Sequence, residues 1–146
     1  MFKRHALFIV IGSCAIALAA CGGGESANVE VTEEMTAALA DTSYSSRGDA
    51  TAGEAVFQSQ CSSCHYATEE VLIGPGMAGV FQPGGPTLPE GVDYGGTLHN
   101  GNLISEENVA NWIREGGQGE IGVMSAIPLE DQEMADLMAY LRTLEK

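Results

Sequence analysis

Nine residues, FQSQCSSCH at positions 57–65, decide how this sequence is interpreted. Cys61 and Cys64 stand three positions apart, and His65 follows the second cysteine directly. The residues before them predict a helix over 49–64, so the two thiols come at its end. Imidazole is the commonest metal ligand among protein side chains. The three side chains together therefore indicate a site for a metal-containing group.

The pattern C-x-x-C-H is the attachment signature of c-type haem. Both sulfurs can reach vinyl carbons on one porphyrin edge, and the imidazole then lies under the ring, within reach of iron. A zinc site is less well supported, because it needs about four ligands and the sequence has no second Cys or His pair. A thioredoxin-like pair needs a βαβ setting, and a structural disulfide stays open as an alternative. The motif predicts one covalent haem c, attached through Cys61 and Cys64, with His65 on the iron.

The N-terminus resembles the leader of a bacterial lipoprotein. A basic start precedes an uncharged stretch over 6–20, which is shorter than the roughly 18–20 residues that span a bilayer. The tetrapeptide LAAC at 18–21 resembles a lipobox, which implies cleavage before Cys21 and a lipid on its sulfur. An ordinary signal peptide followed by a free cysteine is the alternative.

These features predict three parts of the chain. Residues 1–20 are a lipoprotein signal peptide, residues 21–48 are a flexible lipid-anchored tether, and residues 49–146 are the folded domain. The tether has a weak pattern for a short helix around Met35 and Leu39. Further helices are expected from Ser105 to Gly116 and from about Glu130 to Leu144, with a loop rich in proline and glycine over 82–101.

The composition narrows the class of protein. The 146 residues carry 20 acidic and 6 basic side chains, a net charge of −14, and only 6% aromatic residues. The acidic excess argues against binding to nucleic acid and against a basic surface that docks on anionic lipid. The small supply of large apolar side chains favours a core completed by a prosthetic group. No acid–base pair or nucleophile constellation is apparent, so we expect neither enzymatic activity nor a small-molecule substrate.

Met124 is the best candidate for the second axial ligand of the iron. It lies in a predicted loop, where a side chain can turn toward a metal without breaking a helix. Met134 and Met138 belong to the apolar stripe of the last helix, and Met77 lies in an apolar run, so packing explains all three. His99 is the alternative ligand, although its position is that of a surface turn residue. A thioether ligand raises the potential relative to a His/His pair, and a closed six-coordinate iron passes single electrons.

Over residues 49–146 the chain resembles class I cytochromes c. The resemblance implies a small all-α fold in which helices and loops wrap around one covalent haem. It also implies roles for particular residues: the Pro75 carbonyl accepts a hydrogen bond from the ligand histidine, Gly53 and Phe57 pack where the first and last helices cross, and Trp112 lies near the haem at a propionate. The segments that carry the resemblance are CSSCH at 61–65, IGPGMAGV at 73–80, WIR at 112–114 and ADLMAYLRTL at 135–144.

The resemblance implies a one-electron carrier of a membrane-associated respiratory or photosynthetic chain. Its place would be the extracytoplasmic, periplasmic side of a bacterial membrane, and its partners membrane-bound donor and acceptor complexes. The arrangement resembles both tethered shuttles and the monohaem subunit of alternative complex III. The acidic surface predicts either partners with a basic rim or adaptation to salt. Two alternatives stay open: a haem-based gas-binding or sensor module with an open sixth position, and an accessory domain without haem.

Overall fold

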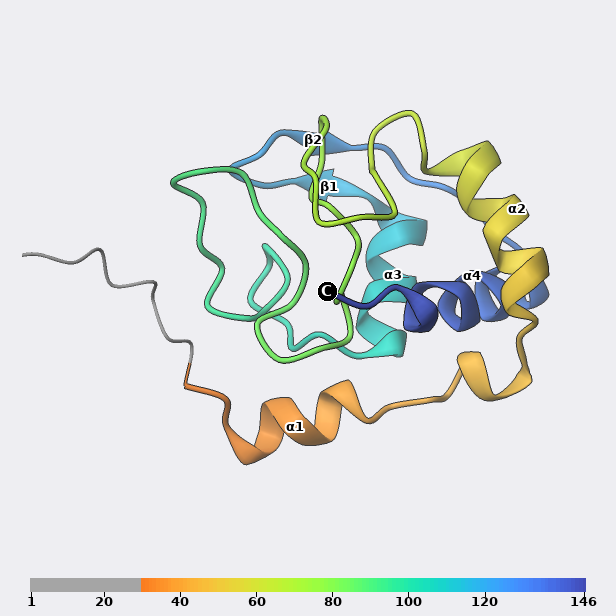
Figure 1. Cartoon of the computed structure of the whole chain (residues 1–146), viewed down its shortest axis with the longest axis horizontal. Coiled ribbons are helices and arrows are strands. Elements are labelled where there is room, and N and C mark those ends of the chain that lie inside the picture. The colour runs from red at the N-terminus through yellow and green to blue at the C-terminus, as the bar shows by residue number, and fades with distance from the viewer. Residues whose placement is uncertain (1–29) are drawn as a thin grey trace, which may run out of the picture.

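The computed structural model describes residues 30–146, so the predicted signal peptide and Cys21 lie outside the described residues. In chain order the elements are α1 (Glu33–Leu39), the 3-10 turn η1 (Ser45–Arg47), α2 (Ala50–Gln60), α3 (Glu106–Glu115), β1 (Gly117–Gln118), β2 (Val123–Met124) and α4 (Asp131–Thr143). Figure 1 shows the helices α2, α3 and α4 toward one side of the molecule, long loops toward the other, and α1 along the lower edge. No helix within residues 30–146 is both long and apolar enough to cross a bilayer.

The fold is mostly helical, as predicted, and the helices begin where their capping residues stand. The Asp49 carboxylate accepts two backbone N–H groups at the start of α2, and the Ser105 hydroxyl accepts one at the start of α3. Glu130 and Glu133 form a reciprocal capping box at the start of α4. The short antiparallel hairpin β1–β2 was not expected from the sequence, since it has only two residues in each strand.

The first and last helices of the domain cross at Gly53, as the resemblance implies. A Cβ atom on Gly53 would overlap the Asp136 carbonyl oxygen and lie 2.8 Å from the Cβ of Tyr140. Phe57 is 1% exposed, and its ring centre lies 5.5 Å from that of Tyr140. Glycine therefore permits a helix contact that any larger residue would push apart.

The breaker-rich segment over 82–101 is a loop without regular helix or strand, as predicted. Isolated bridges hold this region together at two points, between Gly76 and Thr87 and between Thr97 and Leu103. Ile104, which follows the loop, belongs to the same buried core as α2, α3 and α4. The loop thus covers one side of that core.

Residues 41–48, which the sequence assigns to the tether, lie against the domain. The turn η1 packs on α4, and a Cβ atom on Gly48 would overlap the backbone of Ala135. The Asp49 N–H donates a 2.8 Å hydrogen bond to the Asp136 carboxylate. The folded unit therefore begins before residue 49, because contacts with distant parts of the chain order a segment whose composition is that of a linker. The helix α1, for which the sequence has only a weak pattern, is present and precedes residues 41–48 in the chain.

Candidate functional site

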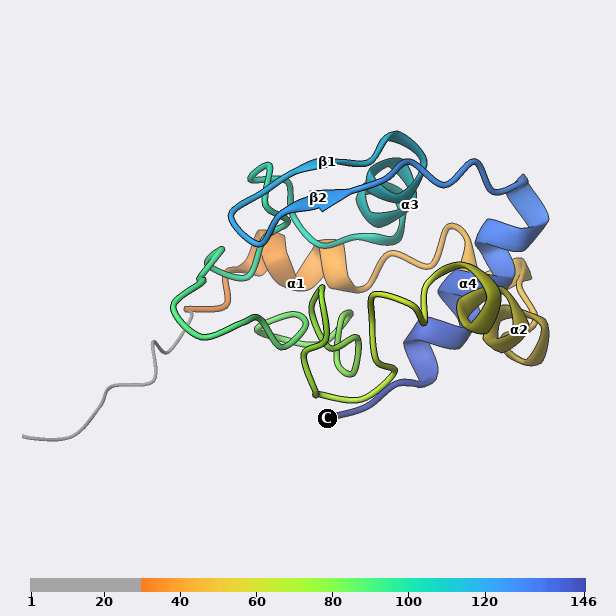
Figure 2. The ribbon, with the colours of Figure 1, turned by 90° about the horizontal axis from the view of Figure 1, so that it is seen from above.

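A cavity of about 460 Å³ lies between the loop that carries the C-x-x-C-H motif and the β1–β2 hairpin. Figure 2 shows the two segments on different sides of the molecule, with the motif loop in yellow-green and the hairpin in blue. Most of the lining is apolar, as in pockets that take a large flat ligand. The cavity brings together all the haem-contacting residues predicted from the sequence, namely Cys61, Cys64, His65, Pro75, Trp112 and Met124.

The two cysteines lie in a tight turn that continues directly from α2. The N–H groups of Cys64 and His65 both donate to the Cys61 carbonyl, at 3.0 and 2.9 Å, which brings the three side chains into one turn. Both cysteines are half-buried free thiols. Burial, together with the neighbouring Cys64, raises the pKa of Cys61 to about 11, so its sulfur is uncharged at neutral pH. The two thiols line the cavity from one turn, as attachment of a porphyrin through two sulfurs requires.

His65 is held in one orientation and one tautomer. Its Nδ1–H donates to the Pro75 carbonyl oxygen at 2.9 Å. Because a carbonyl can only accept, Nδ1 carries the hydrogen and Nε2 keeps a lone pair for a metal. A Cβ atom on Gly74 would lie 2.8 Å from Nδ1 and 2.9 Å from Nε2, so this glycine leaves the ring its space. Gly74 belongs to the stretch over 73–80 that carries the resemblance, but its contact with the histidine is visible only in the structure.

Met124 lines the cavity from the hairpin, on the other wall from the motif loop. It lies in β2, paired with Gly117, whereas the sequence predicted an irregular loop. A paired strand holds the backbone of this methionine more firmly than a loop would. Met77 also lines the cavity, but its N–H bonds to the Tyr66 carbonyl at 2.9 Å, next to His65. The two methionines therefore line the cavity from different segments, Met124 from the hairpin and Met77 from the stretch that bonds to Tyr66.

His99 is not the surface turn residue that the sequence indicated, because it is half-buried and lines the cavity. Its ring centre lies 3.9 Å from that of Trp112, and the Tyr94 ring meets it edge-on at 6.5 Å. A Cβ atom on Gly117 would overlap the Trp112 ring, so a glycine with φ +155° gives the indole its place. These three side chains bring N–H and O–H groups to the cavity wall, where they could hold the carboxylates of a haem.

The described residues do not provide the ligands that a zinc ion would need. Within the part of the chain that the structure describes, no three His, Cys, Asp or Glu side chains gather in a group that could hold a metal ion. A haem needs only His65 and one further ligand from the protein, because the porphyrin supplies the other four. The residues present fit a haem and not a metal ion bound by protein alone.

The fold and the cavity define a small protein in which a porphyrin is attached to the chain through two cysteines. A family model described as cytochrome c matches residues 50–145. A cytochrome c-553-like protein of Synechocystis sp. is 30% identical over 98 residues, which are 67% of this chain and 71% of that protein. A cytochrome c of Tetrahymena pyriformis is 31% identical over 101 residues, covering 66% of this chain and 90% of that protein.

The chain belongs to the cytochrome c family, and it is a class I cytochrome c with covalently bound haem c. Membership of this family confirms the prediction of an electron-transfer protein, not a catalytic enzyme. The predicted fold and cofactor are confirmed as well.

Proposed function

We propose that this cytochrome carries single electrons between membrane-bound partners, with His65 and Met124 as axial ligands and a lipid on Cys21 as its anchor. The observation that carries the ligation is the arrangement of the cavity. His65 and Met124 line the same cavity from separate segments of the chain, and the hydrogen bond from Nδ1 to Pro75 leaves Nε2 of His65 free for a metal. The haem, when bound, supplies an iron that alternates between ferrous and ferric states.

The side chains around the iron favour electron transfer over ligand binding. A methionine in the sixth position leaves no open site for a gas molecule, and its sulfur favours the ferrous state relative to a second histidine. The hydrogen bond from His65 to Pro75 holds the imidazole still during the change of charge. The mostly apolar lining of the cavity would limit the access of water to a bound haem.

The cavity has an exposed apolar rim at which a partner could approach the haem edge. Ile73 is 66% exposed and Val123 is 74% exposed, and both line the cavity. Exposed acidic residues stand in the same two segments, Glu70 before Ile73 and Glu120 before Val123. A partner with an apolar centre and a basic rim would match this surface, and its association would slow as salt screens the charges.

The membrane location rests on the sequence of the N-terminus. The leader and the LAAC tetrapeptide support export and attachment of lipid at Cys21. Export agrees with the haem chemistry, because c-type haem is attached outside the cytoplasm. We therefore place the domain on the extracytoplasmic side of a bacterial membrane, in a respiratory or photosynthetic chain. In this role the protein would act either as a tethered shuttle or as the monohaem subunit of a larger oxidoreductase complex.

Replacement of Met124 by leucine tests the axial ligand, with Met77→Leu as the matched control. Both substitutions keep the volume of the side chain and remove a thioether that lines the cavity. We expect the oxidised wild type and Met77→Leu to show a far-red charge-transfer band from methionine to iron, and their reduced forms to exclude carbon monoxide. Met124→Leu should lose the band and bind carbon monoxide. A wild-type protein that binds carbon monoxide would support the sensor alternative instead.

Mass spectrometry of the exported protein tests the anchor. We expect a chain that begins at Cys21 and carries both a haem and lipid, and a Cys21→Ser variant that leaves the membrane fraction while keeping its haem spectrum. A mature protein with haem but without lipid would contradict the anchor and leave the electron carrier in place.

A further inference from the structure

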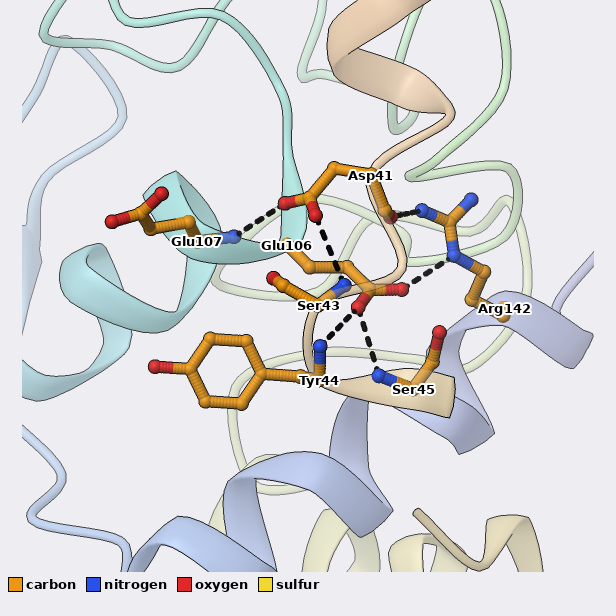
Figure 3. Close-up of polar contacts among 7 residues, drawn as sticks. All are labelled: Asp41, Ser43, Tyr44, Ser45, Glu106, Glu107 and Arg142. Carbon is orange, nitrogen blue, oxygen red and sulfur yellow. Dashed lines mark hydrogen bonds and ion pairs between the residues drawn. The ribbon is translucent and has the colours of Figure 1, made fainter. Parts of the chain in front are cut away.

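A buried carboxylate joins the N-terminal segment to the domain. The Glu106 side chain is completely buried, and it accepts hydrogen bonds from the N–H groups of Tyr44 and Ser45 at 2.9 and 2.8 Å (Figure 3). Its other oxygen accepts from Nε of Arg142 at 2.6 Å. A buried carboxylate is tolerated only when its oxygens are paired in this way. Glu106 therefore holds the segment in place, and the segment in turn supplies hydrogen-bond donors that Glu106 needs.

A second set of contacts lies directly beside Glu106. Arg142 also donates through Nη2 to the carbonyl of Asp41. The Asp41 carboxylate accepts from the N–H groups of Glu107 and Ser43, at 3.1 and 2.9 Å. Burial by itself would raise the pKa of Asp41, but these backbone hydrogen bonds outweigh it and lower the pKa overall. The segment is thus hydrogen-bonded to α3 through Glu106 and Glu107, and to α4 through Arg142.

The scarce positive charge of the chain is concentrated on this segment. Residues 30–146 contain only three arginines and Lys146 as basic residues. Arg114 donates to the Tyr44 hydroxyl at 3.0 Å, and the guanidinium groups of Arg114 and Arg47 lie 5.7 and 5.1 Å from the centre of the Tyr44 ring. Arg142 bonds to the Asp41 carbonyl and Arg47 belongs to the segment, so all three arginines lie in or against residues 41–48. Gly48 then meets α4 so closely that a Cβ atom would overlap the Ala135 carbonyl.

We propose that residues 41–48 form a strap, latched by Glu106, which ends the membrane tether at Asp41, after α1, instead of at the start of α2. The proposal rests on the lipid anchor at Cys21. A tether that ran free to residue 49 could extend to ~95 Å, at 3.3–3.6 Å per residue. With the strap latched and α1 folded, the extended limit from Cys21 to Asp41 is ~55 Å.

The position of α1 also indicates from which side of the domain the tether starts. Figure 1 shows α1 at the lower edge of the molecule and β2, which carries the exposed rim residue Val123, at the upper edge. The tether therefore leaves the domain on the side away from the cavity rim. A domain held close to the membrane in this way would serve partners whose redox centres lie near the bilayer, as neighbouring subunits of one complex do.

Hydrogen exchange on the wild-type, haem-loaded protein tests the strap without any substitution. The amides of Tyr44 and Ser45, which donate to Glu106, should be protected to a degree comparable with the buried turns of α4. Exchange at the rate of an unstructured peptide at both positions would overturn the proposal.

Trypsin treatment of the lipidated protein on phosphatidylcholine vesicles tests the latch. Arg47 is exposed within the strap, and cleavage after it would release the haem domain into the supernatant. We expect Glu106→Gln to speed this release roughly tenfold or more, because it removes the charge from the hydrogen bonds of the latch. Glu107→Gln makes the same change of charge on an exposed neighbour, and its haem domain should be released at the wild-type rate.

The two proposals fail in different ways in this assay. Equal cleavage of wild type and Glu106→Gln would overturn the latch, whereas a haem protein that never binds vesicles would overturn the lipid anchor alone. In the second case, cleavage after Arg47 is followed in solution by mass spectrometry of the fragments. If Glu106→Gln does not fold, the exchange rates of Tyr44 and Ser45 in the wild type decide.

Discussion

Replacing Gly74 by alanine should disturb the iron ligand directly. A Cβ atom at this position would lie 2.8 and 2.9 Å from the two ring nitrogens of His65, where ordinary contacts need at least 3.4 Å. The ring must therefore move by about 0.6 Å to clear the nitrogens, and further to clear Cε1, which the Cβ atom would overlap. Overpacking of this kind costs about 1–3 kcal/mol. Movement of the ring also weakens the bond from His65 to the Pro75 carbonyl, which contributes about 1 kcal/mol.

The same movement should change the reduction potential. The hydrogen bond to Pro75 makes the imidazole a stronger donor, which favours ferric iron. Its weakening should raise the midpoint potential by an amount on the order of tens of millivolts, since ~59 mV is a tenfold change for one electron. Redox titration measures this shift, and urea unfolding followed by circular dichroism measures the loss of stability.

Gly53→Ala is a matched control for this variant. It also places a Cβ atom into occupied space, against Asp136 and Tyr140, but at the crossing of α2 and α4. Overpacking there costs about 1–3 kcal/mol, and the higher helix propensity of alanine returns up to about 1 kcal/mol. We expect both variants to lose stability and only Gly74→Ala to shift the potential. Equal potentials in the two variants would refute the contact between Gly74 and the ligand histidine as a determinant of the iron's properties.

Three further predictions follow from single contacts. Phe57→Ala should lower the free energy of unfolding by about 3–5 kcal/mol in urea titrations, because the side chain is 1% exposed in the core. Ser105→Ala should cost about 1 kcal/mol in the same assay, since its hydroxyl caps α3 through a 3.1 Å bond from the Asn108 N–H; no loss would show that water replaces the cap. The folded-state pKa of Asp41 lies below its unfolded value of about 3.9, so its contribution is complete above that pH and is lost as the pH falls through the folded pKa. The protection factor of Ser43, whose N–H donates to the Asp41 carboxylate, should therefore drop below about pH 4, and Asp41→Asn should abolish this change.

Several features of this cytochrome follow from local sequence alone. Cys61, Cys64 and His65 lie within one turn, so their spacing is enough to predict a haem attached by two sulfurs. The starts of α3 and α4 are equally local, because Ser105 and Glu130 cap the helices that follow them. Such features depend on bonds between residues three or four positions apart, which pattern and propensity describe well.

Other features appear only when distant segments meet. The sequence offers several methionines and His99 as ligands, and only the folded chain shows which of them line the cavity and from which wall. The strap is the clearest case: its composition is that of a linker, yet Tyr44 bonds to a carboxylate 62 residues away. Tertiary structure decides these points, because a buried charge such as Glu106 accepts whichever donors the packed chain brings to it, and sequence separation carries no information about that meeting.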